Sequence, residues 1–204
     1  MYRPVTFVLL LGLLLAPLPA LAQGGPSAFL KGFSQEALQE LTDKSASDAQ
    51  KEQRFRSLLK QGFDVPTIAQ FVIARYWRAA SDTEQQEFIQ VFEDYLVQRF
   101  LPLFAQYDGQ GMKVGEARSD SGNKQLFWVP LQIDQSGGQQ PIQTEWRLRS
   151  VSGSYKILDV RAEGASMALT LRDEYASVMR QKGGLAGLTQ ALKEQIAKGA
   201  FKPK

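Results

Sequence analysis

The sequence of 204 residues contains no histidine and no cysteine. Without cysteine the chain cannot form disulfide bonds, zinc–thiolate sites or thiol nucleophiles. Without histidine it has no imidazole metal ligand and no Ser-His-Asp triad. An enzyme built from this chain would depend on carboxylates, lysine, tyrosine or serine alone. We expect no cofactor and no metal site, and we assign no catalytic residue.

Long apolar runs are also scarce. The first one, from Val8 to Leu15, is short for a bilayer span, and no later stretch approaches the roughly 18 uncharged residues of a transmembrane helix. Arg3 precedes this run, and Ala20-Leu21-Ala22 follows it as a cleavage pattern, which is typical of a secretory signal peptide. We expect residues 1–22 to be this signal and residues 23–204 to form one soluble domain.

Charge of one sign is not in large excess, because 24 lysines and arginines stand against 21 aspartates and glutamates. Removing residues 1–22, whose one charged residue is Arg3, leaves a formal charge of +2. This balance favours neither a nucleic-acid partner nor purely electrostatic adhesion to lipid. The basic tail, 198–204, is expected to fray.

Helical spacing of apolar residues begins soon after the signal segment. It predicts a helix over residues 29–41 and a second helix that follows Ser47 and ends at Gly62, a candidate C-terminal cap. Asp64 before Val65-Pro66 predicts the start of a short, very apolar third helix that extends through Trp77.

The longest periodic segment opens with the capping box Ser81-x-x-Glu84 and contains Pro102, which is expected to kink or restart the helix. Two further helices are expected near the end of the chain, one after Ser166 and one after Gly183-Gly184. Helices therefore flank both ends of the domain.

Between these helices the period changes from 3.6 towards two. Strands are expected over 114–118, 125–133 and 142–149, with a turn at 134–138, and the stretch YKILDVRAEGAS at 155–166 begins as a further strand. One face of the paired strands is apolar and the other polar. The sequence thus predicts an α+β fold with an antiparallel sheet of about four strands and helices on its one apolar face; strong curvature would make this sheet a cone with an open pocket.

Three segments carry a resemblance to a known family. They are FDVPTIAQFVIARYWRAASDTEQQEFIQVFEDYL at 63–96, VPLQI at 129–133 and DVRAEGASMALTLRDEYASVMRQKGGLAGLTQAL at 159–192. In order and spacing they resemble the periplasmic lipid-shuttle family of the Mla pathway, also called the toluene-tolerance family. The chain departs from the family's common residues at Ala74, where glycine is usual, and at Ala165, where valine is usual.

The resemblance implies an NTF2-like half-cone with extra helices at both ends that encloses an apolar cavity. It implies a periplasmic protein that holds the acyl chains of a glycerophospholipid and carries it between two partners, an outer-membrane lipoprotein complex and an inner-membrane ABC transporter with a substrate-binding ring. A relative linked to hopanoid metabolism shares similar motifs, so a hopanoid or another apolar lipid is an alternative ligand.

The apolar faces of the predicted sheet and of the two central helices supply the candidate lipid-binding residues, although an ordinary packed core is the alternative for each of them. The candidates are Ile68, Phe71, Val72, Trp77, Phe92, Leu96, Phe127, Val129, Leu131, Ile142, Trp146, Leu148, Ala165 and Met167.

The junction Glu163-Gly164-x-Ser166 is read mainly as backbone mechanics: the glycine permits a bend and the serine caps the next helix. Asp159 beside Arg161 leaves open an NTF2-like isomerase or hydrolase that uses one carboxylate. An interaction module with a solid core is the remaining alternative.

Overall fold

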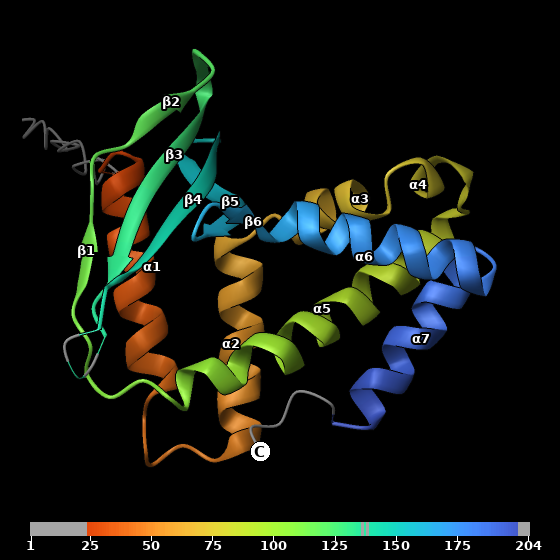
Figure 1. The fold of residues 1–204 in the computed structure, drawn as a ribbon, viewed down its shortest axis with the longest axis horizontal. Helices are drawn as coiled ribbons and strands as arrows, with labels where there is room; N and C mark the ends of the chain where they lie inside the picture. Colours follow the sequence, from red (N-terminus) through yellow and green to blue (C-terminus); the bar gives the residue numbers. More distant parts are fainter. Residues whose placement is uncertain (1–23, 136, 138, 200–204) are drawn as a thin grey trace, which may run out of the picture.

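The computed structural model describes residues 24–199 except 136 and 138. The expected signal peptide and the tail beyond Gly199 lie outside these residues. Figure 1 shows a curved antiparallel sheet with helices along one side, so the predicted α+β class is confirmed. Within the described ranges, no helix combines the length and the apolar character needed to cross a membrane.

The sheet has the strand order β1-β3-β4-β5-β6, and β2 pairs with β3 beside β1. The strands are β1 (Met112–Val114), β2 (Arg118–Asp120), β3 (Asn123–Ile133), β4 (Ile142–Val151), β5 (Ser154–Ala162) and β6 (Ala165–Ser166). Every pair is antiparallel, and β3 and β4 are in register from Leu126 opposite Arg149 to Ile133 opposite Ile142. The three long strands match the predicted ones.

The predicted single strand over 114–118 is wrong, because the chain leaves the ladder between β1 and β2. Pro130 of β3 lies opposite this gap and accepts a hydrogen bond from the Gly115 N–H at 2.9 Å. Since the N–H and C=O of one residue in an antiparallel strand point to the same side, the N–H that proline lacks would have faced this edge. The missing donor interrupts the pairing there.

The helices are α1 (Pro26–Leu41), α2 (Asp48–Gly62), α3 (Val65–Ile73), α4 (Arg75–Ala79), α5 (Asp82–Phe104), α6 (Met167–Lys182) and α7 (Leu185–Ala197). The predicted capping box of Ser81 with Glu84 opens α5, and a second capping box, Ser47 with Gln50, opens α2. The side chain of Asp64 caps α3 by accepting from the Thr67 N–H at 3.2 Å.

Pro102 lies inside the last turn of α5, which continues to Phe104 and does not restart. Helix α6 ends at Gly183, as predicted, and this glycine adopts the left-handed conformation.

Gly62 has a different role from the predicted one. The residue that caps the end of α2 is Phe63, with φ of −103°, and Gly62 itself belongs to the helix. A Cβ atom at Gly62 would lie 2.3 Å from the ring of Phe33 on α1. The glycine therefore leaves room for the Phe33 ring between α1 and α2, and a substitution would force this ring to move.

The predicted helix from Asp64 through Trp77 is divided into α3 and α4 at Ala74. Ala74 has φ of 49° and ψ of −116°, which is a conformation that L-amino acids rarely adopt. The break lets α3 end at the fully buried Ile73, whereas no residue of α4 is buried. Propensity alone could not indicate this turn, because alanine is the strongest helix former.

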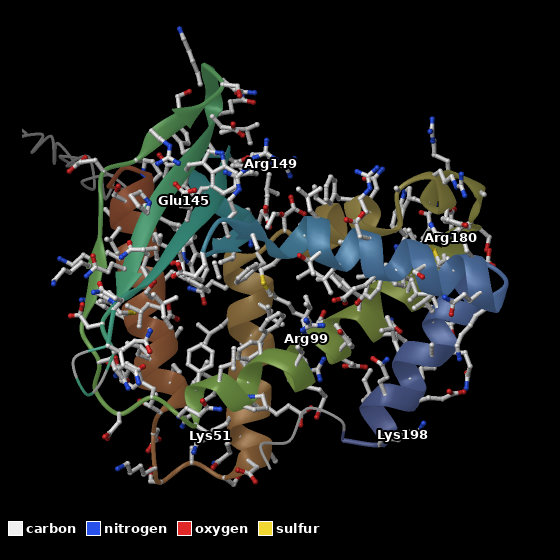
Figure 2. All side chains as sticks on the ribbon, viewed as in Figure 1. Lys51, Arg99, Glu145, Arg149, Arg180 and Lys198 are labelled. Carbon is white, nitrogen blue, oxygen red and sulfur yellow. The ribbon has the colours of Figure 1, made fainter. Side chains whose placement is uncertain are left out.

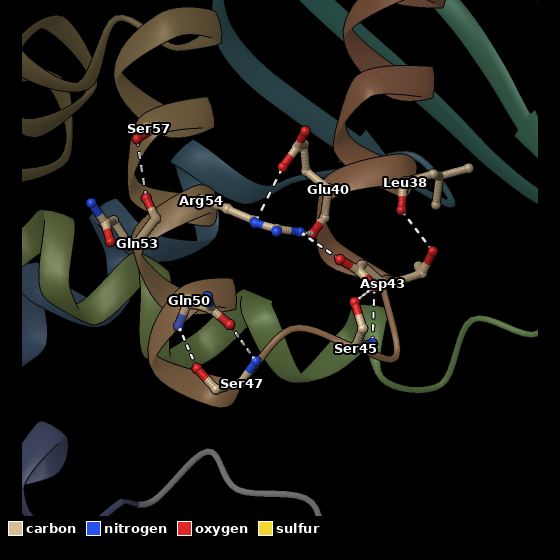
Figure 3. Close-up of polar contacts among 10 residues, drawn as sticks. Leu38, Glu40, Asp43, Ser45, Ser47, Gln50, Gln53, Arg54 and Ser57 are labelled. Atoms are coloured by element: carbon tan, nitrogen blue, oxygen red, sulfur yellow. Dashed lines mark hydrogen bonds and ion pairs between the residues drawn. The ribbon is translucent and has the colours of Figure 1, made fainter.

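The connection between α1 and α2 is fixed by polar contacts (Figure 3). Asp43 accepts hydrogen bonds from the backbone N–H and the hydroxyl of Ser45 at 2.9 and 2.6 Å. Arg54 of α2 donates to the Glu40 carbonyl at 3.0 Å and to the carboxylate of Asp43 at 3.1 Å. These contacts hold the lower ends of two helices that both border the cavity described below.

The outer face of the sheet is polar and charged, as its alternation predicted. Figure 2 labels Glu145 and Arg149 on β4, and Glu145 forms ion pairs with Arg118 and Arg161. The guanidinium of Arg161 lies 3.8 Å from the centre of the Trp128 ring, so this outward tryptophan is only 6% exposed. Only the apolar inner face of the sheet therefore needs helices to cover it.

Candidate functional site

A cavity of about 740 Å³ lies between the inner face of the sheet and helices α1, α2, α3, α5 and α6. This volume falls within the range of about 300–1,000 Å³ that is usual for pockets that hold small ligands. Most of its lining side chains are apolar, and several are aromatic. The interior can therefore hold an apolar molecule but offers few groups for a polar one.

The sheet supplies one wall and the helices supply the others. The inward residues of β3 and β4 that border the cavity are Leu131, Ile133, Ile142 and Trp146. The Trp146 indole N–H donates to the hydroxyl of Thr144 at 3.0 Å, and this hydroxyl donates to the Leu131 carbonyl at 2.6 Å. The indole is thus held in one orientation with its polar atom satisfied, and its ring is left for apolar contact.

Most of the polar lining residues gather where the end of α5 meets the turn between β3 and β4. This end of the cavity carries Gln106, Gln110, Asp134, Gln135 and Gln139. Beside them Leu103 is 58% exposed although it lines the cavity, and Gln106 and Gln139 are exposed. We define this end, from Leu103 to Gln139, as the mouth.

The opposite end of the cavity is closed by aromatic rings. Phe92 of α5 lines the cavity and is fully buried, and its ring is stacked on Phe88 with centroids 5.7 Å apart. Tyr175 of α6 meets the edges of both rings at 6.2 and 6.3 Å. Burial raises the pKa of the Tyr175 phenol well above its ordinary value, so this ring stays neutral at any pH near seven.

Arg99 anchors the same junction from the outside. Figure 2 labels it between α5 and α6, where it donates to the hydroxyl of Tyr95 and lies 3.7 Å from the carboxylate of Glu174. Tyr95 in turn contacts Tyr175 with ring centroids 6.1 Å apart. The closed end is therefore tied together by both packing and charge.

Half of the candidate residues from the sequence border the cavity. They are Ile68, Phe92, Leu96, Leu131, Ile142, Trp146 and Met167. Their positions agree with the predicted lipid-binding role, which stays a prediction.

The other candidates do not border the cavity. They are Phe71, Val72, Trp77, Phe127, Val129, Leu148 and Ala165. Val72, Val129 and Leu148 are fully buried in packed core, whereas Phe71 is 39% exposed under the guanidinium of Arg172. Ala165 is exposed in β6.

Trp77 and Phe127 are held by other contacts. Trp77 lies on α4 and packs, partly buried, against the core. Phe127 packs edge-on against Tyr155, with ring centroids 6.0 Å apart.

Helices α1 and α2 contribute wall residues that the sequence reasoning did not select. These residues are Phe33, Ala37, Leu38, Leu41, Phe55, Leu58 and Leu59. Their helical periodicity was visible in the sequence and is the signal that could have found them, because an apolar stripe on a helix must face either a core or a cavity.

Asp159 lies beside the cavity, but its carboxylate is occupied by the strand-to-helix junction. One oxygen accepts from the backbone N–H groups of Val160 and Ala168 at 2.9 and 3.0 Å, and the other accepts from the hydroxyl of Ser166 at 2.6 Å. Ser166 also caps α6 by accepting from the Leu169 N–H at 3.1 Å. This geometry gives Asp159 a structural task at the start of α6.

The turn before this junction also has a structural role. Gly164 has φ of 82° and Glu163 has φ of 48°, and the Glu163 carboxylate accepts from the backbone N–H of Gln143 at 2.8 Å. No group of acidic residues in the part of the chain that the structure describes is arranged to hold a metal ion.

The fold and this site define the chain as an α+β protein whose helices and sheet surround an apolar cavity with a polar mouth. The model of the MlaC protein family matches residues 31–194. The chain belongs to the MlaC family, which confirms the resemblance carried by its motifs.

Two curated relatives show the same relationship over shorter ranges. The chain is 26% identical over 109 residues to the toluene tolerance protein ttg2D of Pseudomonas putida. This aligned range covers 53% of this chain and 49% of the relative. The chain is 22% identical over 114 residues to the intermembrane phospholipid transport system binding protein MlaC of Haemophilus influenzae, covering 55% and 53%. The aligned part spans about half the length of these relatives.

A solved structure has the same fold. The phospholipid-binding protein from Ralstonia solanacearum, determined in complex with a phospholipid, superimposes with a TM-score of 0.73 at 21% identity. The match covers 88% of this chain and 98% of that protein.

Proposed function

We propose that this protein binds a phospholipid with its acyl chains in the cavity and carries it through the aqueous space between two membranes. The observation that carries the proposal is the cavity of about 740 Å³ with its apolar wall and polar mouth. The names of the two curated relatives and the phospholipid complex of the similar structure support the choice of ligand.

The energetics favour a carrier. Burying one sixteen-carbon chain is worth on the order of 12 kcal/mol relative to water, at about 0.8 kcal/mol per methylene. The lipid, however, leaves a bilayer that is as apolar as the cavity, so its transfer to the protein is close to neutral and reversible. The protein then acts kinetically, because it shields the acyl chains while they cross water.

Direction must come from partners, since the sequence contains no nucleotide-binding motif. We assign this role to an inner-membrane ABC transporter with a substrate-binding ring and to an outer-membrane lipoprotein complex, and we place the protein in the periplasm. The proposal is a non-enzymatic one. It is supported by the occupied carboxylate of Asp159, whose three hydrogen bonds leave it engaged in the fold.

The test is native mass spectrometry of the exported protein, purified without detergent, together with lipid analysis of an organic extract. We expect a diacyl phospholipid at a near-stoichiometric level. A hopanoid or another apolar lipid at that level would change the identity of the proposed ligand but support the carrier function. Only trace lipid on a folded protein from cells with normal membranes would refute the proposal.

A further inference from the structure

The cavity runs along one stripe of helix α5. The lining residues Phe92, Leu96, Phe100 and Leu103 recur every three or four residues, so they share one face of the helix. Phe92 is fully buried at one end of this stripe and Leu103 is 58% exposed at the other. At about 1.5 Å per residue, the eleven steps from Phe92 to Leu103 correspond to about 16 Å from the closed end to the mouth.

The closed end is a rigid wall. Phe88 lies one helical turn behind Phe92 and does not line the cavity, and on α6 the lining likewise stops at Leu171, one turn before Tyr175. Phe88, Phe92 and Tyr175 pack against one another with centroids 5.7 to 6.3 Å apart, and Phe88 and Tyr175 are 0% and 3% exposed. Such close-packed rings have no free space into which a ligand could push them.

We propose that Phe92, held by Phe88 and Tyr175, sets the length of acyl chain that the protein binds best. The inference rests on the proposed lipid-carrier function. An extended chain advances about 1.3 Å per methylene, from bonds of about 1.5 Å at tetrahedral angles, so the distance from Leu103 to Phe92 accommodates about twelve methylenes. Each further methylene left in water at the mouth lowers the affinity about fourfold.

Substitutions at Phe92 and Leu96 should lengthen or shorten the acyl chain that fits. Phe92→Ala opens the space as far as Phe88, one turn or about 6 Å deeper, which is room for about four more carbons. Phe92→Leu removes part of the ring and makes room for about two. Leu96→Phe places a new ring one turn nearer the mouth and shortens the cavity by about four carbons.

The experiment offers each lipid-stripped protein vesicles with equal amounts of didecanoyl, dimyristoyl, dipalmitoyl, distearoyl and diarachidoyl phosphatidylcholine. Mass spectrometry then measures the chain lengths of the bound lipid. We expect the ratio of diarachidoyl to dimyristoyl lipid to rise at least about tenfold in the two Phe92 variants. In Leu96→Phe, where about eight methylenes still fit, we expect the ratio of dimyristoyl to didecanoyl lipid to fall at least about tenfold.

Phe29→Leu is the matched control, because Phe29 is a helical phenylalanine that packs on Phe33 and Tyr155 and does not line the cavity. Its bound lipid should have the wild-type lengths. Near-UV circular dichroism identifies folded variants. If Phe92→Ala does not fold, the chain lengths bound by Phe92→Leu and Leu96→Phe test the proposal.

Two negative results are distinguishable. A wild-type protein that takes up no lipid from these vesicles contradicts the carrier function itself. If the Phe92 and Leu96 variants take up lipid normally and their bound lipid has the wild-type chain lengths, the carrier function stands. The role of Phe92 in setting the chain length is then refuted.

Discussion

Replacing Ala74 by glycine should stabilise the protein. Ala74 joins α3 to α4 with φ of 49° and ψ of −116°, where a Cβ atom is strained. A residue held in such a region costs about 1–3 kcal/mol, whereas glycine adopts positive φ at no steric cost. Glycine is therefore the residue that fits this backbone geometry best.

The gain is smaller than the relieved strain. Glycine makes the unfolded chain more flexible, which costs about 0.5–1 kcal/mol. The difference leaves a net stabilisation of about 1 kcal/mol, which corresponds to a rise in melting temperature of about 2–4 °C for a domain of this size.

The assay is urea unfolding and thermal melting of the lipid-stripped protein. Ala176→Gly is the control, because Ala176 is partly exposed in the middle of a regular helix, α6. There the same change should destabilise by about 1 kcal/mol. If Ala74→Gly lowers the melting temperature as Ala176→Gly does, the strain argument is wrong.

Three other predictions concern the cavity wall, the junction and acid stability. Ile142→Glu should abolish lipid binding because its carboxylate enters the cavity, whereas Ala165→Glu, on the exposed β6, should keep normal lipid and melting behaviour; loss of lipid in both variants would contradict their placement. Asp159→Asn should lower the free energy of unfolding by about 1–3 kcal/mol, measured in urea, because Ser166 and two N–H groups lose a charged acceptor, and lipid should remain bound. Hydrogen bonds from Ser45, first from its hydroxyl and then from its backbone, with a further one from Arg54, lower the pKa of Asp43 from 3.8 to about 2. Because the folded-state pKa is the lower one, this contribution is complete above pH 4 and is lost as the pH falls towards 2, and Asp43→Asn should flatten the stability profile measured across that window.

Local signals predicted the elements well, because their causes are local. The caps at Asp64 and Ser81 need only a side chain and an N–H three residues away, and both formed as expected. Ala74 is the opposite case: its high helix propensity indicated continuation, and the observed break depends on the burial of Ile73 by distant residues.

The division between wall and core could not be predicted from the strand pattern. Val129 and Leu131 alternate onto the same face of β3 and are 0% and 2% exposed, yet only Leu131 borders the cavity. The difference arises from how far each helix stands from the sheet at that point. That distance is a property of tertiary packing, and it has no counterpart in the periodicity of a single strand.

The cavity wall joins the two ends of the described chain, since Phe33 of α1 and Leu171 of α6 both border it. No fragment that ends before α6 contains the whole wall, so the cavity depends on contacts between residues that are distant in sequence. If the protein carries lipid as proposed, a chain that has not yet reached α6 has no complete site for it. Lipid uptake would then report that the chain has folded at least through Leu171.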